Sequence, residues 1–197
     1  MSQKKVWDKI AESWYGFRHW PTKGVKKLVW KKGKILDVGC GNCRNLLPFK
    51  EMECYGVDFS DGVLEQAKKY IKKHNLNVNL KKADMTKLPF KDKSFDYILS
   101  LATLHHLKNP ENGIKEIYRV LKIGGQAYIT IWSKMQLRFL FKKRETYVKW
   151  GKENRYYNFI GFLRLRKMLK SCNFKILRSR MLGKNLEFIV ESRPQSK

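Results

Sequence analysis

The sequence predicts an α/β fold: a doubly wound, mostly parallel sheet that ends in an antiparallel hairpin. Two observations support this prediction. Short apolar stretches alternate with helical patterns along the first two thirds of the chain, as expected when helices connect the strands of a parallel sheet. Near the C-terminus, two apolar stretches flank Gly183-Lys184-Asn185, and turn residues between two strand-like stretches are typical of a hairpin.

The elements are expected in a regular order. The strands are predicted at 34–39, 54–58, 78–83, 95–101 and 126–132, and the two hairpin strands at 174–180 and 186–191, which makes seven in all. Helices are predicted at 42–50, 61–74 and 112–121. The second helix is expected to begin at Ser60 or Asp61 and to end at Asn75, and the third to end near Gly124-Gly125.

The length of 197 residues fits one domain. We expect N-terminal helices on the substrate side in 1–30, a ligand-binding core in 31–133 and a basic substrate and hairpin region in 134–197. No apolar run reaches the roughly 18 residues that cross a membrane, and the N-terminus has no apolar signal segment. The four cysteines are too few for a disulfide scaffold. These features predict a cytoplasmic protein with no membrane partner.

The charge is strongly positive. The chain has 43 Lys and Arg against 17 Asp and Glu, a formal net charge of +26. Between Lys134 and Lys184 there are 16 basic residues and only two acids, Glu145 and Glu153. A concentration of positive charge favours a polyanionic partner, nucleic acid first. The alternative is a solvated basic surface that reflects only a Lys-rich proteome.

The segment with the most specific chemistry is the loop after the first strand. Asp37 precedes a Gly-x-Gly turn, and Asp58 ends the next strand 21 residues later. Ligands of open parallel sheets bind at the carboxyl ends of the strands, and an acid at the second strand end accepts hydrogen bonds from a ribose diol. A dinucleotide requires a third glycine where this chain has Arg44. Asp37 suits a ligand with a cation better than a pyrophosphate, which favours S-adenosylmethionine.

The cofactor-binding residues expected on this basis come from four strand ends. Asp84 and Met85 are expected at the adenine, or Asp84 caps a turn instead. The full predicted set is Asp37, Gly39, Cys40, Gly41, Asn42, Asp58, Phe59, Asp84, Met85, Ser100 and Leu101. The spacing of Cys40 and Cys43 also occurs in zinc and redox sites, but no second Cys pair or His pair completes a metal site in the sequence. We therefore expect no metal.

With these residues in place, the chain resembles the class I S-adenosylmethionine-dependent methyltransferases over about residues 30–133. The resemblance is carried by Asp37-Val38-Gly39-Cys40-Gly41, Asp58, Ala83-Asp84, Phe95-Asp96 and Gly124-Gly125. It implies a Rossmann-like methyltransferase fold and S-adenosylmethionine as cofactor.

A narrower resemblance covers nearly the whole chain. Residues 6–11 and 18–21, the Leu104-His105-His106 segment and Asn154-Arg155-Tyr156-Tyr157 are similar to the tRNA wobble-uridine carboxymethyl methyltransferases and to the methyltransferase domain of the AlkB-type tRNA hydroxylase. This resemblance implies a tRNA substrate, methyl esterification of 5-carboxymethyluridine at the wobble position, and a small zinc-binding activator subunit. The chain departs from the family at Cys43, where the family usually has Gly.

The implied reaction needs no general base, because a carboxylate with a pKa near 4 is already ionised at neutral pH. Catalysis then depends on alignment and exclusion of water. Arg18 is expected to grip the carboxylate in a bidentate manner, and His106 to donate to the same group or to position the uracil. The alternatives are a surface ion pair of Arg18 with Asp8 or Glu12, and a purely structural histidine.

The substrate-binding residues are expected to be Trp20, Arg155, Tyr156 and Tyr157. Arg155, Tyr156 and Tyr157 would stack on a flipped-out base or bind a phosphate, and the alternative for the tyrosines is packing in a hairpin or in the core. Trp20 is expected to be a stacking platform or a hydrophobic anchor of the N-terminal helix.

Two other functions remain open from the sequence. One is a small-molecule methyltransferase of the quinone-pathway type, which shares the cofactor half of the fold. The other is a non-catalytic RNA-binding protein on a degenerate methyltransferase fold.

Overall fold

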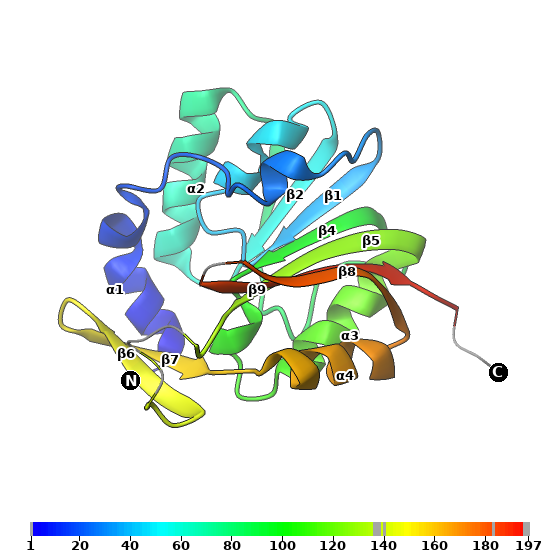
Figure 1. The fold of residues 1–197 in the computed structure, drawn as a ribbon. Helices are drawn as coiled ribbons and strands as arrows, with labels where there is room; N and C mark the ends of the chain where they lie inside the picture. Colours follow the sequence, from blue (N-terminus) through cyan, green and yellow to red (C-terminus); the bar gives the residue numbers. More distant parts are fainter. Residues whose placement is uncertain (1, 136–138, 140, 183, 195–197) are drawn as a thin grey trace.

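A computed structural model describes residues 2–135, 139, 141–182 and 184–194 of the chain. In this part of the chain, the strands form a seven-stranded sheet in the order β3-β2-β1-β4-β5-β9-β8 and a separate two-stranded sheet of β6 and β7. Strands β1 to β5 are parallel, and β9 runs antiparallel to both of its neighbours, β5 and β8. The predicted fold class is therefore confirmed (Figure 1).

The large sheet contains β1 (Lys34–Val38), β2 (Glu53–Asp58), β3 (Val78–Lys82), β4 (Phe95–Leu101), β5 (Leu121–Trp132), β8 (Phe174–Leu182) and β9 (Asn185–Ser192). The small sheet contains β6 (Glu145–Trp150) and β7 (Glu153–Asn158). The α-helices are α1 (Gln3–Tyr15), α2 (Asp61–His74), α3 (Pro110–Val120) and α4 (Phe162–Ser171), and the 3₁₀-helices are η1 (Val25–Lys27), η2 (Arg44–Phe49) and η3 (Leu104–His106).

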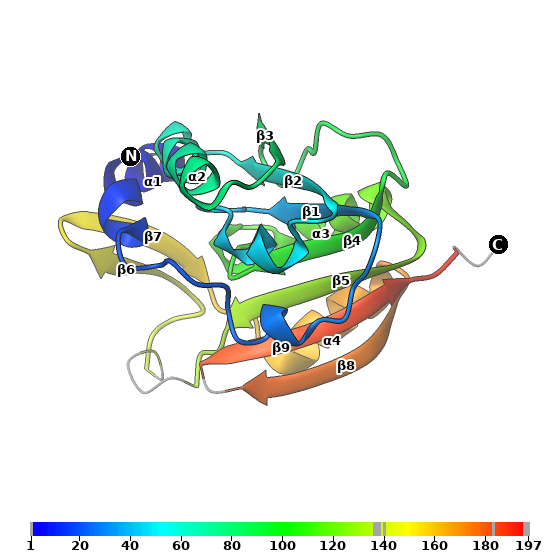
Figure 2. The ribbon, with the colours of Figure 1, turned by 90° about the horizontal axis from the view of Figure 1, so that it is seen from above.

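Each face of the large sheet is covered by helices. Helices α3 and α4 bury apolar residues such as Ile114, Ile117 and Leu165 against one face. On the other face, α2, η1 and η2 contribute Ala67, Val25 and related residues to a second apolar cluster. Figures 1 and 2 show the sheet between these two layers. Burial on both faces explains why the parallel strands read as nearly continuous apolar runs.

The prediction for α2 is confirmed at both ends. The Ser60 hydroxyl accepts a hydrogen bond from the N–H of Val63 and so caps the first turn. Asn75 ends the helix in the left-handed conformation, with φ 49°, which Asn tolerates better than most residues. Ser60 lies two residues after Asp58, which ends β2.

Two helix predictions were wrong in detail. The segment 42–50 holds only the 3₁₀-helix η2, because Pro48 lacks the N–H that an α-helix needs. Helix α3 ends at Val120, and Gly124-Gly125 lies within β5. There the pairing with β4 shifts register between Phe95 and Tyr97, and Gly124 has φ 77°. The glycine pair thus permits an irregularity in the strand and does not end the helix.

The hairpin of β6 and β7 stands apart from the large sheet beside α1 (Figure 2). Three contacts hold it there: the Gln3 side-chain oxygen accepts from the N–H of Tyr156 at 2.8 Å, Lys9 pairs with Glu153 at 2.9 Å, and the Trp150 indole donates to the Ser13 hydroxyl at 3.0 Å. The N-terminal helix and the β6–β7 hairpin are therefore one docked unit. The predicted hairpin of β8 and β9 is also present, although Gly183 in its turn lies outside the described residues.

Candidate active site

The loop after β1 can be built only with glycine at two positions. Gly39 has φ 69° and Gly41 has φ 58°, in the left-handed region that disfavours other residues. A Cβ atom at Gly39 would lie 2.4 Å from Cγ2 of Thr103, and one at Gly41 would lie 2.6 Å from the Tyr15 hydroxyl. The two glycines therefore let the backbone pass closely between α1 and the segment after β4.

Asp58 ties this loop to the end of β2. One carboxylate oxygen accepts from the N–H of Gly41 at 3.2 Å, and the other accepts from the N–H of Ser60 at 3.2 Å. Burial raises the pKa of Asp58 to about 6, against the opposing effect of these backbone donors. The carboxylate is thus fixed in place beside the loop, as the predicted ribose-binding role requires.

Asp37 is the second carboxylate of the loop. It is only 1% exposed, and neither of its carboxylate oxygens has a hydrogen-bond partner among the described residues. Burial raises the pKa of Asp37 to about 7, although the positive charge of Arg44 acts in the opposite direction. A buried carboxylate without a partner is unfavourable. A ligand that brings a positive charge or a donor to this loop would relieve that cost.

A cavity of about 280 Å³ opens between the strand ends, α1 and the β6–β7 hairpin. Its lining comes from elements far apart in the sequence. The lining residues include Trp7, Trp14, Tyr15, Arg18, Gly39, Cys40, Gly41, Arg44, Asp58, Phe59, Leu101, Ala102, Thr103, His105, His106, Trp132 and Tyr157. The carboxyl ends of β1, β2 and β4 meet here, as expected for the ligand site of a parallel sheet.

Six of the predicted cofactor residues line the cavity, namely Gly39, Cys40, Gly41, Asp58, Phe59 and Leu101. The other five do not line it, and one of them is Asp37, which is buried. Asn42 is buried and donates to the carbonyl of Arg18. Ser100 and Met85 are buried in the sheet and its core. Asp84 is exposed and accepts from the N–H and hydroxyl of Thr86, both at 2.8 Å. The turn-cap alternative for Asp84 is what this structure contains.

Arg18 lines the cavity from the segment after α1. Its guanidinium carbon lies 3.9 Å from the centroid of the Trp14 ring and 4.1 Å from that of Phe17, and it donates to the Trp14 carbonyl. No ion pair of Arg18 is found among the described residues. Burial and the neighbouring charges of Arg44 and Arg155 lower the pKa of Arg18 to about 10. The alternative considered from the sequence, a surface ion pair with Asp8 or Glu12, is therefore absent there.

Both histidines of η3 line the cavity, and both are held neutral. Burial lowers the pKa of His106 to about 4, and burial also lowers that of His105. Nδ1 of His106 lies 2.8 Å from the carbonyl oxygen of Tyr156. Because a carbonyl only accepts, the single proton of neutral His106 is on Nδ1, and Nε2 is left as an acceptor. His106 therefore cannot donate to a carboxylate in this arrangement, and the alternative role of positioning a base fits better.

Arg155, Tyr156 and Tyr157 follow one another on β7 but point to different places. Tyr157 lines the cavity and stacks on His105, with ring centroids 5.0 Å apart. Arg155 is 2% exposed and donates to the Tyr157 hydroxyl at 2.7 Å. The Tyr156 hydroxyl instead donates to Glu145 at 2.8 Å. Only Tyr157 of the three is thus in contact with the cavity, with Arg155 directly behind it.

Trp20 does not line the cavity. Its side chain is 69% exposed, so it is not the hydrophobic anchor considered from the sequence. The Lys26 ammonium lies 5.9 Å from the centroid of its ring, and the Arg44 guanidinium donates to its carbonyl at 2.9 Å.

A group of aromatic side chains beside the cavity, Trp14 and Trp150, was not predicted from the sequence. Trp14 and Trp150 pack edge to face with centroids 4.5 Å apart, and Arg155 lies 4.1 Å from the Trp14 centroid. The buried positions Trp7, Ile10 and Trp14 of α1 have helical spacing, a signal that could have identified the cavity-facing side of α1. No local pattern indicates that Trp150 joins them, since this depends on the docking of β6.

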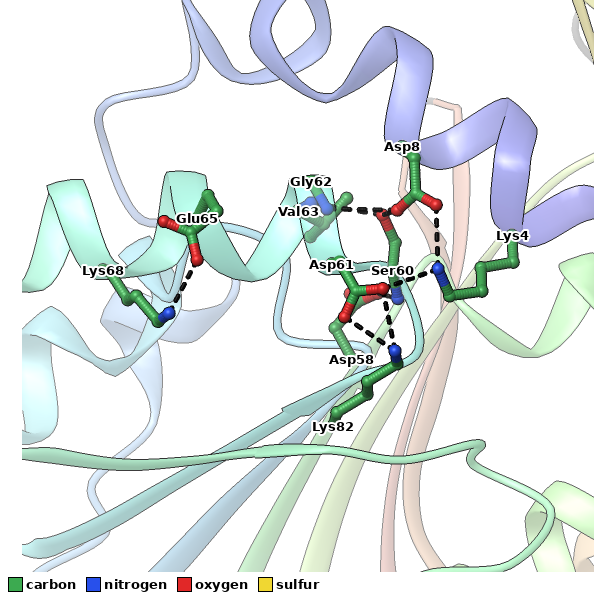
Figure 3. A network of polar contacts seen from close by, with 10 residues as sticks. All are labelled: Lys4, Asp8, Asp58, Ser60, Asp61, Gly62, Val63, Glu65, Lys68 and Lys82. Carbon is green, nitrogen blue, oxygen red and sulfur yellow. Dashed lines mark hydrogen bonds and ion pairs between the residues drawn. The ribbon is translucent and has the colours of Figure 1, made fainter.

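A polar network fixes α1 over the site (Figure 3). Asp8 accepts from the Ser60 hydroxyl at 2.6 Å and from the N–H of Gly62 at 3.0 Å, and it pairs with Lys4 at 2.9 Å. Burial acts to raise the pKa of Asp8, but the hydrogen bonds from Ser60, Lys4 and Gly62 outweigh it and lower the pKa to about 2. Lys4 also pairs with Asp61 at 2.7 Å. The helix that carries Trp14 is thus anchored at the start of α2.

Two further features bear on the kind of site. In the described ranges, no group of three or more His, Cys, Asp or Glu side chains is arranged to hold a metal ion. None of the helices in the same ranges has the length and apolar character needed to cross a membrane.

Comparisons with known proteins agree with this geometry. The family model described as a methyltransferase domain matches residues 36–129. A protein of Encephalitozoon cuniculi, described by its name only as a methyltransferase, is 30% identical over 176 residues, which are 81% of this chain and 80% of that protein. The tRNA (carboxymethyluridine(34)-5-O)-methyltransferase of Saccharomyces cerevisiae is 35% identical over 135 residues, 66% of this chain and 47% of that protein.

The chain spans less than half the length of several curated relatives that it matches: 26% to 47% of the tRNA methyltransferases from mouse, human, cattle and yeast. Among solved structures, a Haloferax volcanii complex between the Trm112 methyltransferase activator and a methyltransferase has a TM-score of 0.80 at 15% identity, with both chains fully covered. The fold, the loop held by Asp58 and the match over four fifths of the E. cuniculi protein lead to one conclusion: the chain belongs to the class I S-adenosylmethionine-dependent methyltransferases.

Proposed function

We propose that this methyltransferase esterifies a carboxylate on tRNA, namely that of 5-carboxymethyluridine at the wobble position. The proposal rests mainly on the position of Arg18. This residue lines the cavity and has no acidic partner among the described residues. A guanidinium binds a carboxylate with two parallel hydrogen bonds. The similarity to the yeast carboxymethyluridine methyltransferase supports the same choice of substrate.

The residues around the loop fit the family cofactor. When bound, S-adenosylmethionine supplies a methyl group on a positively charged sulfur. Asp58 would accept hydrogen bonds from the ribose hydroxyls, because its oxygens are already held beside the loop by Gly41 and Ser60. Asp37 would stabilise the positive charge of the amino-acid part, which is the role that its unpartnered oxygens leave open.

On the substrate side, the residues align and desolvate a group that is already ionised. Arg18 would hold the carboxylate in line for transfer, and the aromatic rings of Trp14 and Tyr157 would exclude water. Neutral His106 would accept a hydrogen bond from the uracil through Nε2. No residue in this scheme takes up a proton, because the carboxylate is already ionised at neutral pH, so the reaction needs no general base.

A tRNA partner agrees with the charge of +26. We also infer a small activator subunit as a partner. The support is the Haloferax volcanii complex, in which the methyltransferase that shares this fold is bound to the Trm112 activator. Neither partner follows from the cavity alone, so each needs its own measurement.

The proposal is tested with tRNA from cells that lack this last methylation step. The protein is incubated with labelled S-adenosylmethionine, with and without a co-expressed activator, and the tRNA is digested to nucleosides. We expect the label in a derivative of carboxymethyluridine, released by mild alkali as an ester must be. Label in an alkali-stable nucleoside, or label only in small molecules of a cell extract, would contradict it and favour the quinone-type alternative.

A further inference from the structure

A second basic site lies at the opposite end of the sheet from the cavity. A hollow of about 690 Å³ forms between the end of α4, the start of β8 and the end of β9. Four basic residues line it and no acidic residue does: Arg166, Lys170, Lys175 and Arg193. We propose that this hollow binds the phosphate backbone of the RNA substrate, far from the nucleotide that is methylated. The tRNA identity of that substrate rests on the proposed function.

The chain folds so that these four charges converge. Arg166 and Lys170 are one helical turn apart on α4, so they share a face of the helix. Helix α4 buries Leu165, Met168 and Leu169 against the sheet, which fixes the orientation of its basic side. Lys175 follows at the start of β8, and Arg193 comes directly after β9, its antiparallel neighbour.

The charges of the hollow are not neutralised by any acidic side chain that the structure describes. None of the four residues forms an ion pair with an acid in the described part of the chain. Glu191 lies opposite Lys175 in the strand pairing, yet it neither pairs with Lys175 nor lines the hollow. Four unpaired cations at one place repel one another, so an anionic ligand relieves repulsion there.

Protection of the sheet edge does not account for the whole arrangement. Strand β8 is an edge strand, and basic residues on edges oppose unwanted strand pairing. This explains Lys175 and Arg178 of β8. It does not explain Arg166 and Lys170, which come from a helix, or Arg193, which follows the neighbouring strand.

The position of the hollow requires an extended partner. Asn185 at the start of β9 lines the cavity, and Arg193 lies eight residues further along. At about 3.3 Å per residue, the two sites are roughly 26 Å apart. A single nucleotide cannot reach both, whereas a folded RNA can. Further exposed basic residues lie on the elements that run between the cavity end and the hollow end of the sheet. They are Arg164 and Lys167 on α4 and Arg178 on β8.

The test compares two variants that remove the same charge. In the hollow variant, Arg166, Lys170, Lys175 and Arg193 are all replaced by Gln. In the control variant, Lys68, Lys69, Lys72 and Lys73, which are exposed on α2, are replaced by Gln. Each change removes four positive charges, so a general effect of net charge is equal in both.

Binding of tRNA is measured by fluorescence anisotropy at several salt concentrations. We expect the hollow variant to bind at least tenfold more weakly at 100 mM salt, and its salt slope to fall by about 0.9 for each phosphate that the protein no longer neutralises. The control variant should change less than threefold. Equal weakening of both variants, or an unchanged slope in the hollow variant, would overturn the proposal.

Two further readouts separate this inference from the proposed function. Methylation of a trinucleotide with the modified uridine in the middle, which is too short to span the roughly 26 Å to the hollow, should have the same kcat in all three proteins. If the wild type methylates no tRNA, the proposed function fails, but the binding of structured RNA still decides the role of the hollow. If the hollow variant loses binding to phosphatidylserine vesicles and keeps its tRNA affinity, the hollow is a lipid-binding surface and the proposal is wrong.

Discussion

The guanidinium carbon of Arg155 lies 4.1 Å from the centroid of the Trp14 ring, and that of Arg18 lies 3.9 Å from the same centroid. Arg155 is on β7 and Trp14 on α1, so this contact joins the β6–β7 hairpin to the N-terminal helix. It also brings two positive charges to one indole ring, although only Arg18 of the two lines the cavity, and a cation over an indole is stabilised by about 0.5–2 kcal/mol. Arg18 and Arg44 therefore make part of the cavity lining cationic, and Asp58 makes another part acidic.

Replacing Arg18 with Ala should separate substrate alignment from cofactor binding. Loss of a charge-assisted hydrogen bond of about 1.5–3 kcal/mol corresponds to a 10- to 150-fold fall in kcat/KM for tRNA. Affinity for S-adenosylmethionine, measured by calorimetry, should change less than threefold. The control is Lys23→Ala, an exposed residue in the same segment. Near-normal transfer by the Arg18 variant would mean that another group holds the carboxylate.

Replacing Asp58 with Ala should weaken cofactor binding by at least about a hundredfold, because two hydrogen bonds to a charged acceptor are removed at about 1.5–3 kcal/mol each. The variant also leaves the N–H groups of Gly41 and Ser60 without their acceptor. Asp61→Ala removes an exposed acid three residues away and is the control. If the Asp58 variant keeps micromolar affinity in calorimetry, the ribose assignment is wrong.

The raised pKa of Asp37 should be visible in how the free energy of unfolding of the ligand-free protein changes with pH. Folding raises this pKa from 3.8 to about 7, so the folded state holds a proton that the unfolded state has lost. The group therefore destabilises the fold progressively as pH rises from about 4 to 7, by roughly 4 kcal/mol at most. Asp37→Asn should match the wild type at pH 4 in urea unfolding and exceed its stability at pH 8.

The control for this pH effect has the opposite sign. Burial acts to raise the pKa of Asp96, but its ion pair with Lys122 and the N–H of Lys34 outweigh burial and lower it. Asp96 therefore stabilises the fold above its unfolded pKa of 3.8. Asp96→Asn should become less stable than the wild type as pH rises through this range. A difference between Asp37→Asn and wild type that does not change with pH would show that Asp37 has a normal pKa.

The left-handed conformation of Cys43 gives a prediction about the cofactor loop. Cys43 has φ 63° and is fully buried, a conformation that costs a non-glycine residue about 1 kcal/mol or more. Cys43→Gly relieves this strain and offsets the lost packing, so its unfolding free energy should stay within about 1 kcal/mol of wild type. Cys43→Ala loses packing without relief and should be the less stable of the two. The reverse order in urea unfolding would contradict the strain argument.

The parts of the site that local sequence determines were predictable. Asp37 and Asp58 are at the ends of apolar runs, and the Gly-x-Gly turn between them has a distinct backbone requirement. Residues whose role depends on docking were not predictable. Asp84 follows a strand like the others, but β3 is an edge strand and Asp84 caps its own turn. The proton position on His106 depends on the carbonyl of Tyr156, 50 residues away.

The contact between Trp14 and Trp150 could not be predicted from the sequence for the same reason. Trp14 is on α1 and Trp150 is on β6. The sequence pattern of neither element indicates that the two pack together. A hairpin was only an alternative for Tyr156 and Tyr157, and the strands β6 and β7 were not predicted, because the alternating exposed residues and many charges of β6 resemble a solvated segment. Its docking on α1 depends on the contacts of Gln3, Lys9 and Ser13 with residues more than 130 positions away.

The most direct test of the account uses two anticodon stem-loops that differ in one group. One carries 5-carboxymethyluridine at the wobble position and the other carries unmodified uridine, and methyl transfer from labelled S-adenosylmethionine is measured for both with the activator present. Because Arg18 is assigned to a carboxylate, only the first RNA should accept the methyl group, and the product should be a methyl ester. Equal transfer to both RNAs, or transfer to neither while the cofactor binds normally, would contradict the assignment of the cavity to a tRNA carboxylate.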